Sequence, residues 1–227
     1  MIRMLAIAML FVAQGVLAAP EQLTAVYQAT RNGQPFAHVT ETFSQENGHY
    51  KLESVTKGIG VYALFGTRRL YSEGAVTAEG LRPAHFEQQQ SDQPKKAVAA
   101  DFDWNENTLA MKYKGKTTTA PLEPGAQDLL SYAYQFIFKP PQGDEVAMAV
   151  TTGRKLRTYR YRITEHDVAL ETPAGKYKAI HLVEAEADDD QKEIWLGAEA
   201  HHIPVRITMK DDNGAKIEQT LTSLHVE

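Results

Sequence analysis

The chain has 227 residues, of which 43% are hydrophobic, and a formal net charge of −5. This mild acidity lacks the broad positive field that nucleic acid or an anionic lipid surface attracts, so we expect neither as a partner. The sequence has no cysteine. That excludes disulfides, thiol nucleophiles, thiolate metal sites and lipid attachment to an N-terminal cysteine.

The first residues follow the layout of a secretory signal peptide. Arg3 provides a positive charge, residues 5–12 form an uncharged apolar run, and small residues follow up to Ala19. Such an apolar run is too short to span a bilayer stably. Because Pro20 makes cleavage directly before it unfavourable, we expect cleavage after Ala18. An uncleaved anchor or a buried N-terminal helix is the alternative.

These features predict two parts, a signal peptide over residues 1–18 and a single β-rich domain over residues 19–227. Export would place that domain in the bacterial periplasm. No later segment approaches about 18 consecutive apolar residues, so we expect no transmembrane segment in the mature chain.

Short apolar–polar alternations separated by turn residues dominate the rest of the chain. Asn32-Gly33 is a strong hairpin signal. Residues 98–104, 109–113 and 205–210 each alternate with a period of two, which is typical of half-buried antiparallel strands. We expect a mainly β fold of about ten to twelve strands, arranged as a sandwich or a barrel-like sheet.

One segment, near residues 127–138, breaks this alternation and predicts a helix. Its polar residues recur three or four positions apart and make one narrow stripe: Asp128, Ser131, Gln135 and Lys139. The remaining positions are apolar, so the helix should be buried on several sides, and Pro140-Pro141 ends it. We expect it to lie against the concave face of a curved sheet. A shorter helical turn is predicted over residues 61–65.

No set of residues predicts catalysis or metal binding. His201 and His202 are adjacent, and on a strand adjacent side chains point to opposite faces. The pair Glu184 and Glu186 could serve a glycosidase, but solvated strand faces explain it better. Asp188-Asp189-Asp190 lacks the spacing of a calcium loop and should cap a hairpin. We therefore expect no enzymatic activity, no cofactor and no metal.

Basic residues cluster in one place, over residues 154–162. On a strand, Arg160 and Arg162 share one face and Tyr159 and Tyr161 share the other. The arginines could bind an acidic glycan, a phosphate group or a peptide. Alternatively, they pair with carboxylates of neighbouring strands, which is ordinary sheet stabilisation.

Four segments in this order resemble an exported bacterial family catalogued as domain of unknown function 3108. They are Asp128-Leu129-Leu130-Ser131 with Ala133-Tyr134, the run TPAGKYKAI at 172–180, EIWL at 193–196, and HIPVRI at 202–207. The resemblance extends upstream through residues 31–33 and 80–83. It implies a curved antiparallel sheet around a helix, similar to the open half-barrel of the periplasmic lipoprotein carriers. It implies no catalytic residues.

The leading hypothesis is a non-catalytic binding or carrier module for a hydrophobic ligand such as lipid or an acyl chain. We expect Tyr132, Phe136 and Trp195 to line its cavity, with Trp195 filling the space between helix and sheet. If no cavity exists, the face of Arg160 and Arg162 is the candidate binding surface. A structural or assembly factor that binds an envelope protein through a sheet edge is the first alternative. A hydrolase of envelope polymers is the second.

Overall fold

A computed structural model describes residues 19–185, 192–211 and 213–227. The predicted signal peptide, Glu186 and the acidic run at 188–190 lie outside these residues. In the part that the structure describes, no helix is long and apolar enough to cross a membrane.

One sheet of 15 strands makes up almost the whole described domain. Its strands are β1 (Gln22–Arg31), β2 (Gln34–Glu46), β3 (His49–Gly58), β4 (Thr67–Thr77), β5 (Gly80–Gln90), β6 (Val98–Asp103), β7 (Thr108–Tyr113), β8 (Lys116–Pro121), β9 (Gln127–Asp128), β10 (Glu145–Thr151), β11 (Leu156–Thr172), β12 (Gly175–Glu184), β13 (Glu193–Gly197), β14 (Pro204–Lys210) and β15 (Lys216–Val226). One α-helix, α1 (Ser131–Phe138), and three short 3₁₀ segments, η1 (Gly60–Phe65), η2 (Pro94–Lys96) and η3 (Ala198–Ala200), join them.

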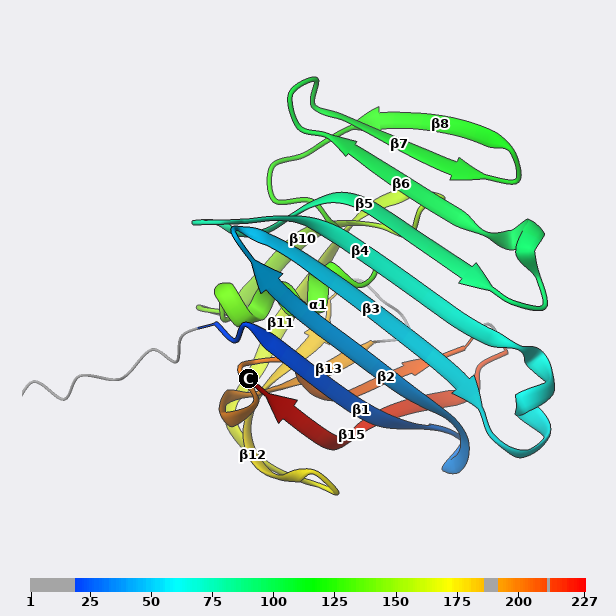
Figure 1. Ribbon diagram of the computed structural model, residues 1–227. Helices are drawn as coiled ribbons and strands as arrows, with labels where there is room; N and C mark the ends of the chain where they lie inside the picture. Colours follow the sequence, from blue (N-terminus) through cyan, green and yellow to red (C-terminus); the bar gives the residue numbers. More distant parts are fainter. Residues whose placement is uncertain (1–18, 186–191, 212) are drawn as a thin grey trace, which may run out of the picture.

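The sheet grows in both directions from its centre, where the first and last strands pair. Its order is β8-β7-β6-β5-β4-β3-β2-β1-β15-β14-β13-β12-β11-β10-β9. All neighbours are antiparallel except β9 and β10. We call β1–β8 the first wing and β9–β15 the second wing. Figure 1 shows that the sheet curls, so that the second wing lies behind the first, with α1 toward one end and η1 at the other.

The expectation of a mainly β fold is confirmed, but the expected number of strands was too low. The missed strands carry no apolar alternation. All but one of the six residues of β8 are exposed, and β9 has only two residues. The helix also begins later than residue 127, because Gln127 and Asp128 pair with Val150 and Thr151 of β10. The expected turn at 61–65 is present as η1.

Because apolar and polar residues alternate along the strands, the apolar side chains point into the interior that the curled sheet encloses. In β1, Leu23, Ala25 and Tyr27 are buried while the residues between them are partly exposed. In β6, Val98 and Ala100 are buried in the same way. The predicted face of residues 98–104 therefore becomes part of one core that runs through both wings.

Three residues of the polar stripe, Asp128, Ser131 and Gln135, are buried in the interior, while Lys139 at its end is exposed. Asp128 is fully buried just before the helix, and its Oδ1 accepts the backbone amides of Leu130 and Ser131, each at 2.8 Å. Its Oδ2 accepts the hydroxyl of Ser72 on β4 at 2.6 Å. Ser72 in turn lies 2.9 Å from the hydroxyl of Tyr50 on β3. The start of the helix is thus fixed to the middle of the first wing.

Gln135, further along the stripe, bonds to the start of β5. Its Oε1 accepts the amide of Leu81 at 2.6 Å, and its Nε2 donates to the carbonyl of Glu79 at 2.8 Å. Lys139 forms an ion pair with the Glu79 side chain. This close approach requires Gly80, where a Cβ atom would lie 2.4 Å from Gln135 Oε1 and where φ is +94°.

Asp128→Ala should lower the free energy of unfolding by about 3 kcal/mol, because it leaves buried donors without an acceptor. Asp128→Asn keeps an oxygen for the two backbone amides, so it should cost only about 1 kcal/mol. Chemical denaturation measures both.

The matched control is Asp103→Ala. Asp103 Oδ1 accepts two backbone amides, each at 3.0 Å, in an exposed turn, so its loss should cost less than about 1 kcal/mol. Equal losses for Asp103→Ala and Asp128→Ala would contradict the anchoring role of the buried carboxylate.

Candidate functional site

Two adjoining hollows lie inside the curl. One, of about 240 Å³, lies beside the start of α1, and the other, of about 350 Å³, extends toward η1. Five residues line both hollows: Val39, Thr56, Arg68, Met209 and Gln219. The hollows therefore adjoin one another, and we call the two together the inner groove.

The walls of the inner groove are mainly apolar and come from both wings. Val39 and Leu70 belong to the first wing, and Ile207, Met209 and Ile217 belong to the second. Ile207 and Met209 share a face of β14, in the alternation that the sequence shows at 205–210. In the hollow toward η1, the wings face one another and no residue of α1 contributes to the lining.

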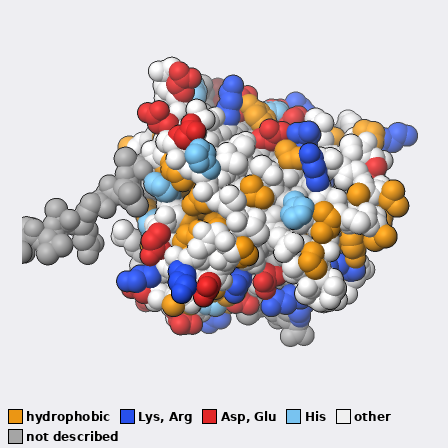
Figure 2. All heavy atoms as spheres, turned by 60° about the horizontal axis from the view of Figure 1, so that its bottom comes forward, with side chains coloured by type: hydrophobic (Ala, Val, Ile, Leu, Met, Phe, Trp, Pro, Cys, Tyr) orange, Lys and Arg blue, Asp and Glu red, His pale blue; other side chains and the backbone are white. Residues whose placement is uncertain are grey.

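The η1 segment forms the outer end of the groove and carries exposed apolar side chains. Tyr62 and Phe65 line the hollow, and Tyr62 packs edge-on against Phe36 with ring centroids 5.6 Å apart. Val61, Leu64 and Phe65 are 72%, 84% and 59% exposed. Figure 2 shows hydrophobic side chains gathered at the right-hand edge of the molecule, the side on which η1 lies in Figure 1.

A carboxylate lies among hydroxyl groups in the hollow beside the start of α1, which we call the deep hollow. Glu41 accepts the hydroxyl of Ser54 at 3.1 Å and that of Tyr134 on α1 at 3.0 Å. Burial is the largest influence on this group and raises the pKa of Glu41, while the two hydrogen bonds oppose the rise. Both carboxylate oxygens are therefore occupied by the protein itself, and they link β2, β3 and the helix.

Two basic side chains also line the deep hollow. Lys192 donates to the Tyr132 hydroxyl and lies over its ring, 4.4 Å from the centroid. Arg68 donates to Gln88 Oε1 on β5 at 2.7 Å. Burial lowers the pKa of Arg68, and the nearby charge of Arg154 lowers it further.

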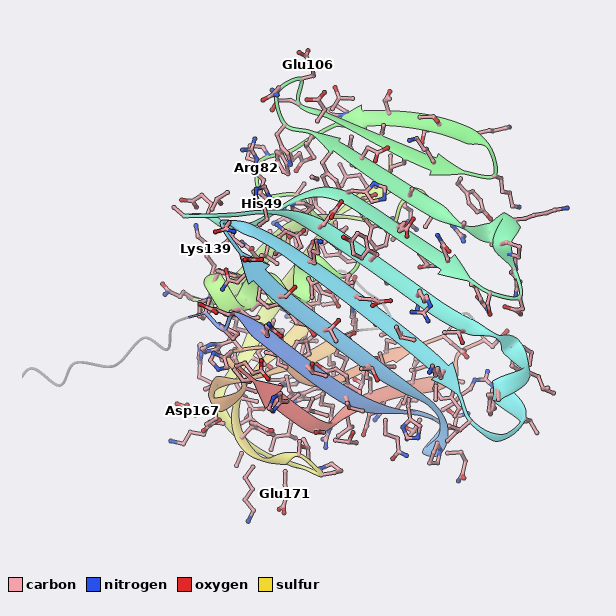
Figure 3. The ribbon with its side chains drawn as sticks, viewed as in Figure 1. His49, Arg82, Glu106, Lys139, Asp167 and Glu171 are labelled. Atoms are coloured by element: carbon pink, nitrogen blue, oxygen red, sulfur yellow. The ribbon has the colours of Figure 1, made fainter. Side chains whose placement is uncertain are left out.

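A second recess lies at the other end of the first wing and is open to solvent. It measures about 800 Å³ and includes His49, Arg82, Trp104 and Glu106 in its lining. Figure 3 shows His49 and Arg82 near one another at the ends of their strands, with Glu106 at the tip above them. Arg82 lies over the Trp104 ring, 5.0 Å from its centroid. This arrangement is a surface recess between strand ends.

The three aromatic residues expected to line a cavity lie in three different settings. Tyr132 lines the deep hollow. Phe136 is only 3% exposed and belongs to the packed core. Trp195 does not fill the space between helix and sheet, because its neighbours Ile194 and Leu196 occupy the inward positions of β13 with no exposure. It stacks instead on His181, with ring centroids 4.3 Å apart.

Arg160 and Arg162 of the basic cluster are exposed on β11, and neither lines the inner groove. Arg160 pairs with Glu145 on the neighbouring β10 at 3.1 Å, which is the cross-strand pairing expected of a solvated face. Arg162 lies opposite Glu145 in the register of the two strands. Tyr161, between them, is buried on the other face.

Sequence reasoning missed Glu41, Arg68 and Gln219 as groove residues. The polar residues on the inward positions of β2, β4 and β15 interrupt otherwise apolar faces, and this interruption is the signal that could have identified them. No group of three or more histidine, aspartate or glutamate residues in the described chain is placed to hold a metal ion.

The fold and the groove together define a class: a mainly β protein whose single, mostly antiparallel open sheet curls around one short helix and leaves an internal groove. The chain belongs to the family described as "Protein of unknown function (DUF3108)", which matches residues 26–222. None of the curated proteins compared with it matches.

Glu41→Gln should make stability less sensitive to pH. Because burial raises the pKa of Glu41, the folded protein holds this proton more tightly than the unfolded chain. The wild type therefore loses stability as the pH rises from about 4 through the folded-state pKa, and the variant has no such proton to lose. We expect the free energy of unfolding of the variant, relative to that of the wild type, to increase as the pH is raised from about 4 to about 8. A constant difference across this range would contradict the burial of an ionisable carboxyl.

Proposed function

We propose that this protein is an exported, non-catalytic binding or carrier module for a hydrophobic ligand, such as a lipid or an acyl chain, which it holds in the inner groove. The observation that carries the proposal is the groove itself. Packed protein interiors leave few voids larger than a water molecule, whereas these two hollows measure about 240 and 350 Å³. Ligand sites typically measure about 300–1,000 Å³ with mainly apolar walls.

The exposed apolar side chains of η1 fit this role. Val61 and Leu64 lie beside Phe65, which is both exposed and part of the groove lining. Exposed apolar side chains that adjoin a groove mark sites of interaction with apolar partners. A hydrophobic ligand could therefore pass between its source and the groove along an apolar surface.

The architecture supports the comparison with the half-barrels of periplasmic lipoprotein carriers. A curved sheet encloses a buried helix and leaves apolar space beside it, as that comparison requires. Shared architecture alone does not give a function. The proposal therefore depends on the groove and its lining.

A non-catalytic role agrees with the way the polar groups of the groove are used. Glu41 accepts bonds from Ser54 and Tyr134, and Lys192 donates to Tyr132. These bonds tie neighbouring elements together and do not converge on a common reaction centre, which a hydrolase would need.

Assembly through a sheet edge is the second candidate, and the free edge of β8 favours it. This strand ends the first wing and is exposed along most of its length. However, the strand has only six residues, Lys116 begins it and Pro121 ends it. Short length, lysine and proline are the features by which natural proteins protect an edge from pairing. We therefore rank ligand binding first.

Filling the groove should abolish ligand uptake. Thr56 lines both hollows, so Thr56→Trp should weaken binding of the uncharged probes dodecanol and Nile red by at least about tenfold. Native mass spectrometry detects the alcohol, and fluorescence detects the dye.

The matched control is Val55→Trp, one residue earlier on β3 and on its other face. It adds a comparable side chain outside the groove and should leave binding unchanged. Wild-type protein that takes up neither probe, or Thr56→Trp protein that binds like the wild type, would overturn the proposal.

Export predicts a defined mature N-terminus. Protein recovered from the periplasmic fraction should have an intact mass corresponding to a chain that begins at Ala19. A cytoplasmic protein that retains residues 1–18 would contradict the localisation, independently of the test for ligand binding.

A further inference from the structure

Arg68 is the cation at the centre of the inner groove. It lies on an inward position of β4 and lines both hollows, opposite Met209 and Gln219 of the second wing. Its guanidinium donates one hydrogen bond to the neutral side chain of Gln88. In the described part of the chain, no carboxylate lies within ion-pair distance of it.

Three other arginines of the sheet, by contrast, have close carboxylate partners. Arg69, the next residue, points to the opposite face and pairs with Glu53 at 2.8 Å. Arg31 pairs with Asp211 at 2.9 Å, and Arg160 pairs with Glu145 at 3.1 Å. These three arginines are thus neutralised by carboxylates of the protein, while Arg68 inside the groove is not.

This arrangement is costly unless something else supplies the negative charge. A guanidinium keeps its charge at all physiological pH values, and a desolvated charge without a counter-ion is strongly unfavourable. The protein increases the positive potential here, because Arg154 lies near enough to act on Arg68. Lys192 adds another positive charge to the deep hollow.

The carboxyl group in the same hollow does not neutralise Arg68. Glu41 is bonded to Ser54 and Tyr134, and its pKa is influenced by burial and by these two bonds. It lies outside ion-pair distance of Arg68. The groove therefore combines apolar walls with a central unpaired guanidinium.

We infer that the ligand of the inner groove is an amphiphile with an anionic headgroup, a carboxylate or a phosphate, that pairs with Arg68. The planar guanidinium matches two oxygens of either group. The apolar hollows on both sides of Arg68 then hold the hydrocarbon chain. This inference rests on the proposed function and adds the charge class of the ligand.

The test compares probes of the same chain length that differ in their headgroup: laurate, dodecyl phosphate and uncharged dodecanol. Wild-type protein should bind laurate or dodecyl phosphate at least about tenfold more tightly than dodecanol, as a charge-assisted pair provides. The preferred probe distinguishes a carboxylate from a phosphate headgroup. Titration calorimetry measures all three.

Arg68→Gln should remove this preference, so that the three probes bind with similar affinity, whereas Arg68→Lys should retain part of it. Arg69→Gln is the matched control, because it removes a charge from the adjacent position on the outer face, and it should keep the full preference. Without ligand, Arg68→Gln protein should unfold at the same temperature as the wild type or at a higher one, since the variant lacks the unpaired charge.

The outcomes separate the inference from the proposal on which it rests. If wild-type protein binds neither laurate nor dodecyl phosphate more tightly than dodecanol, or if Arg68→Gln keeps the preference, the charge class is wrong while the groove remains a hydrophobic site. If none of the three probes binds, the proposed function fails as well. A lower unfolding temperature for Arg68→Gln with an unchanged preference would make Arg68 a structural residue.

Discussion

The buried carboxylate of Asp128 is the interaction on which the arrangement of the domain depends. A single sheet that grows outward from the β1–β15 pair has nothing in its ladder to fix the distance between its two wings. Asp128 provides this link, because it ends β9 of the second wing, accepts the first amides of α1, and bonds to Ser72 in the middle of the first wing. Satisfying one buried group thereby positions the helix, both wings and the space that remains between them.

The inner groove follows from this anchoring. α1 fills the interior on the side where Asp128 and Gln135 hold it against β4 and β5. The helix is short, so the interior toward η1 has only strand side chains to fill it. Small or polar residues such as Thr56 and Gln219 stand at inward positions there. The groove results from the short length of α1 and from the small or polar side chains at a few inward positions.

Much of the fold could be predicted from period-two alternation, as the buried face of residues 98–104 shows. Strands without such alternation could not be predicted in this way. β8 is exposed on both faces, and β9 is held by hydrogen bonds of two polar residues. The site was harder to predict, because strand pattern does not say which face is inward. Trp195 illustrates this point, since its smaller neighbours Ile194 and Leu196 take the inward positions.

Burial raises the pKa of Glu41 and lowers the pKa of Arg68, but only Glu41 can become neutral near neutral pH. Desolvation disfavours the charged form of both groups. The carboxyl can respond by holding a proton, and two hydroxyl groups of the protein already satisfy its oxygens. The guanidinium cannot lose its charge at neutral pH, and its one bond is to a neutral amide. A groove with one group that can become neutral and one that cannot has an excess of positive charge at its centre. An uncharged ligand would leave that charge unbalanced, and the placement of these two residues is therefore the basis on which we propose an anionic headgroup.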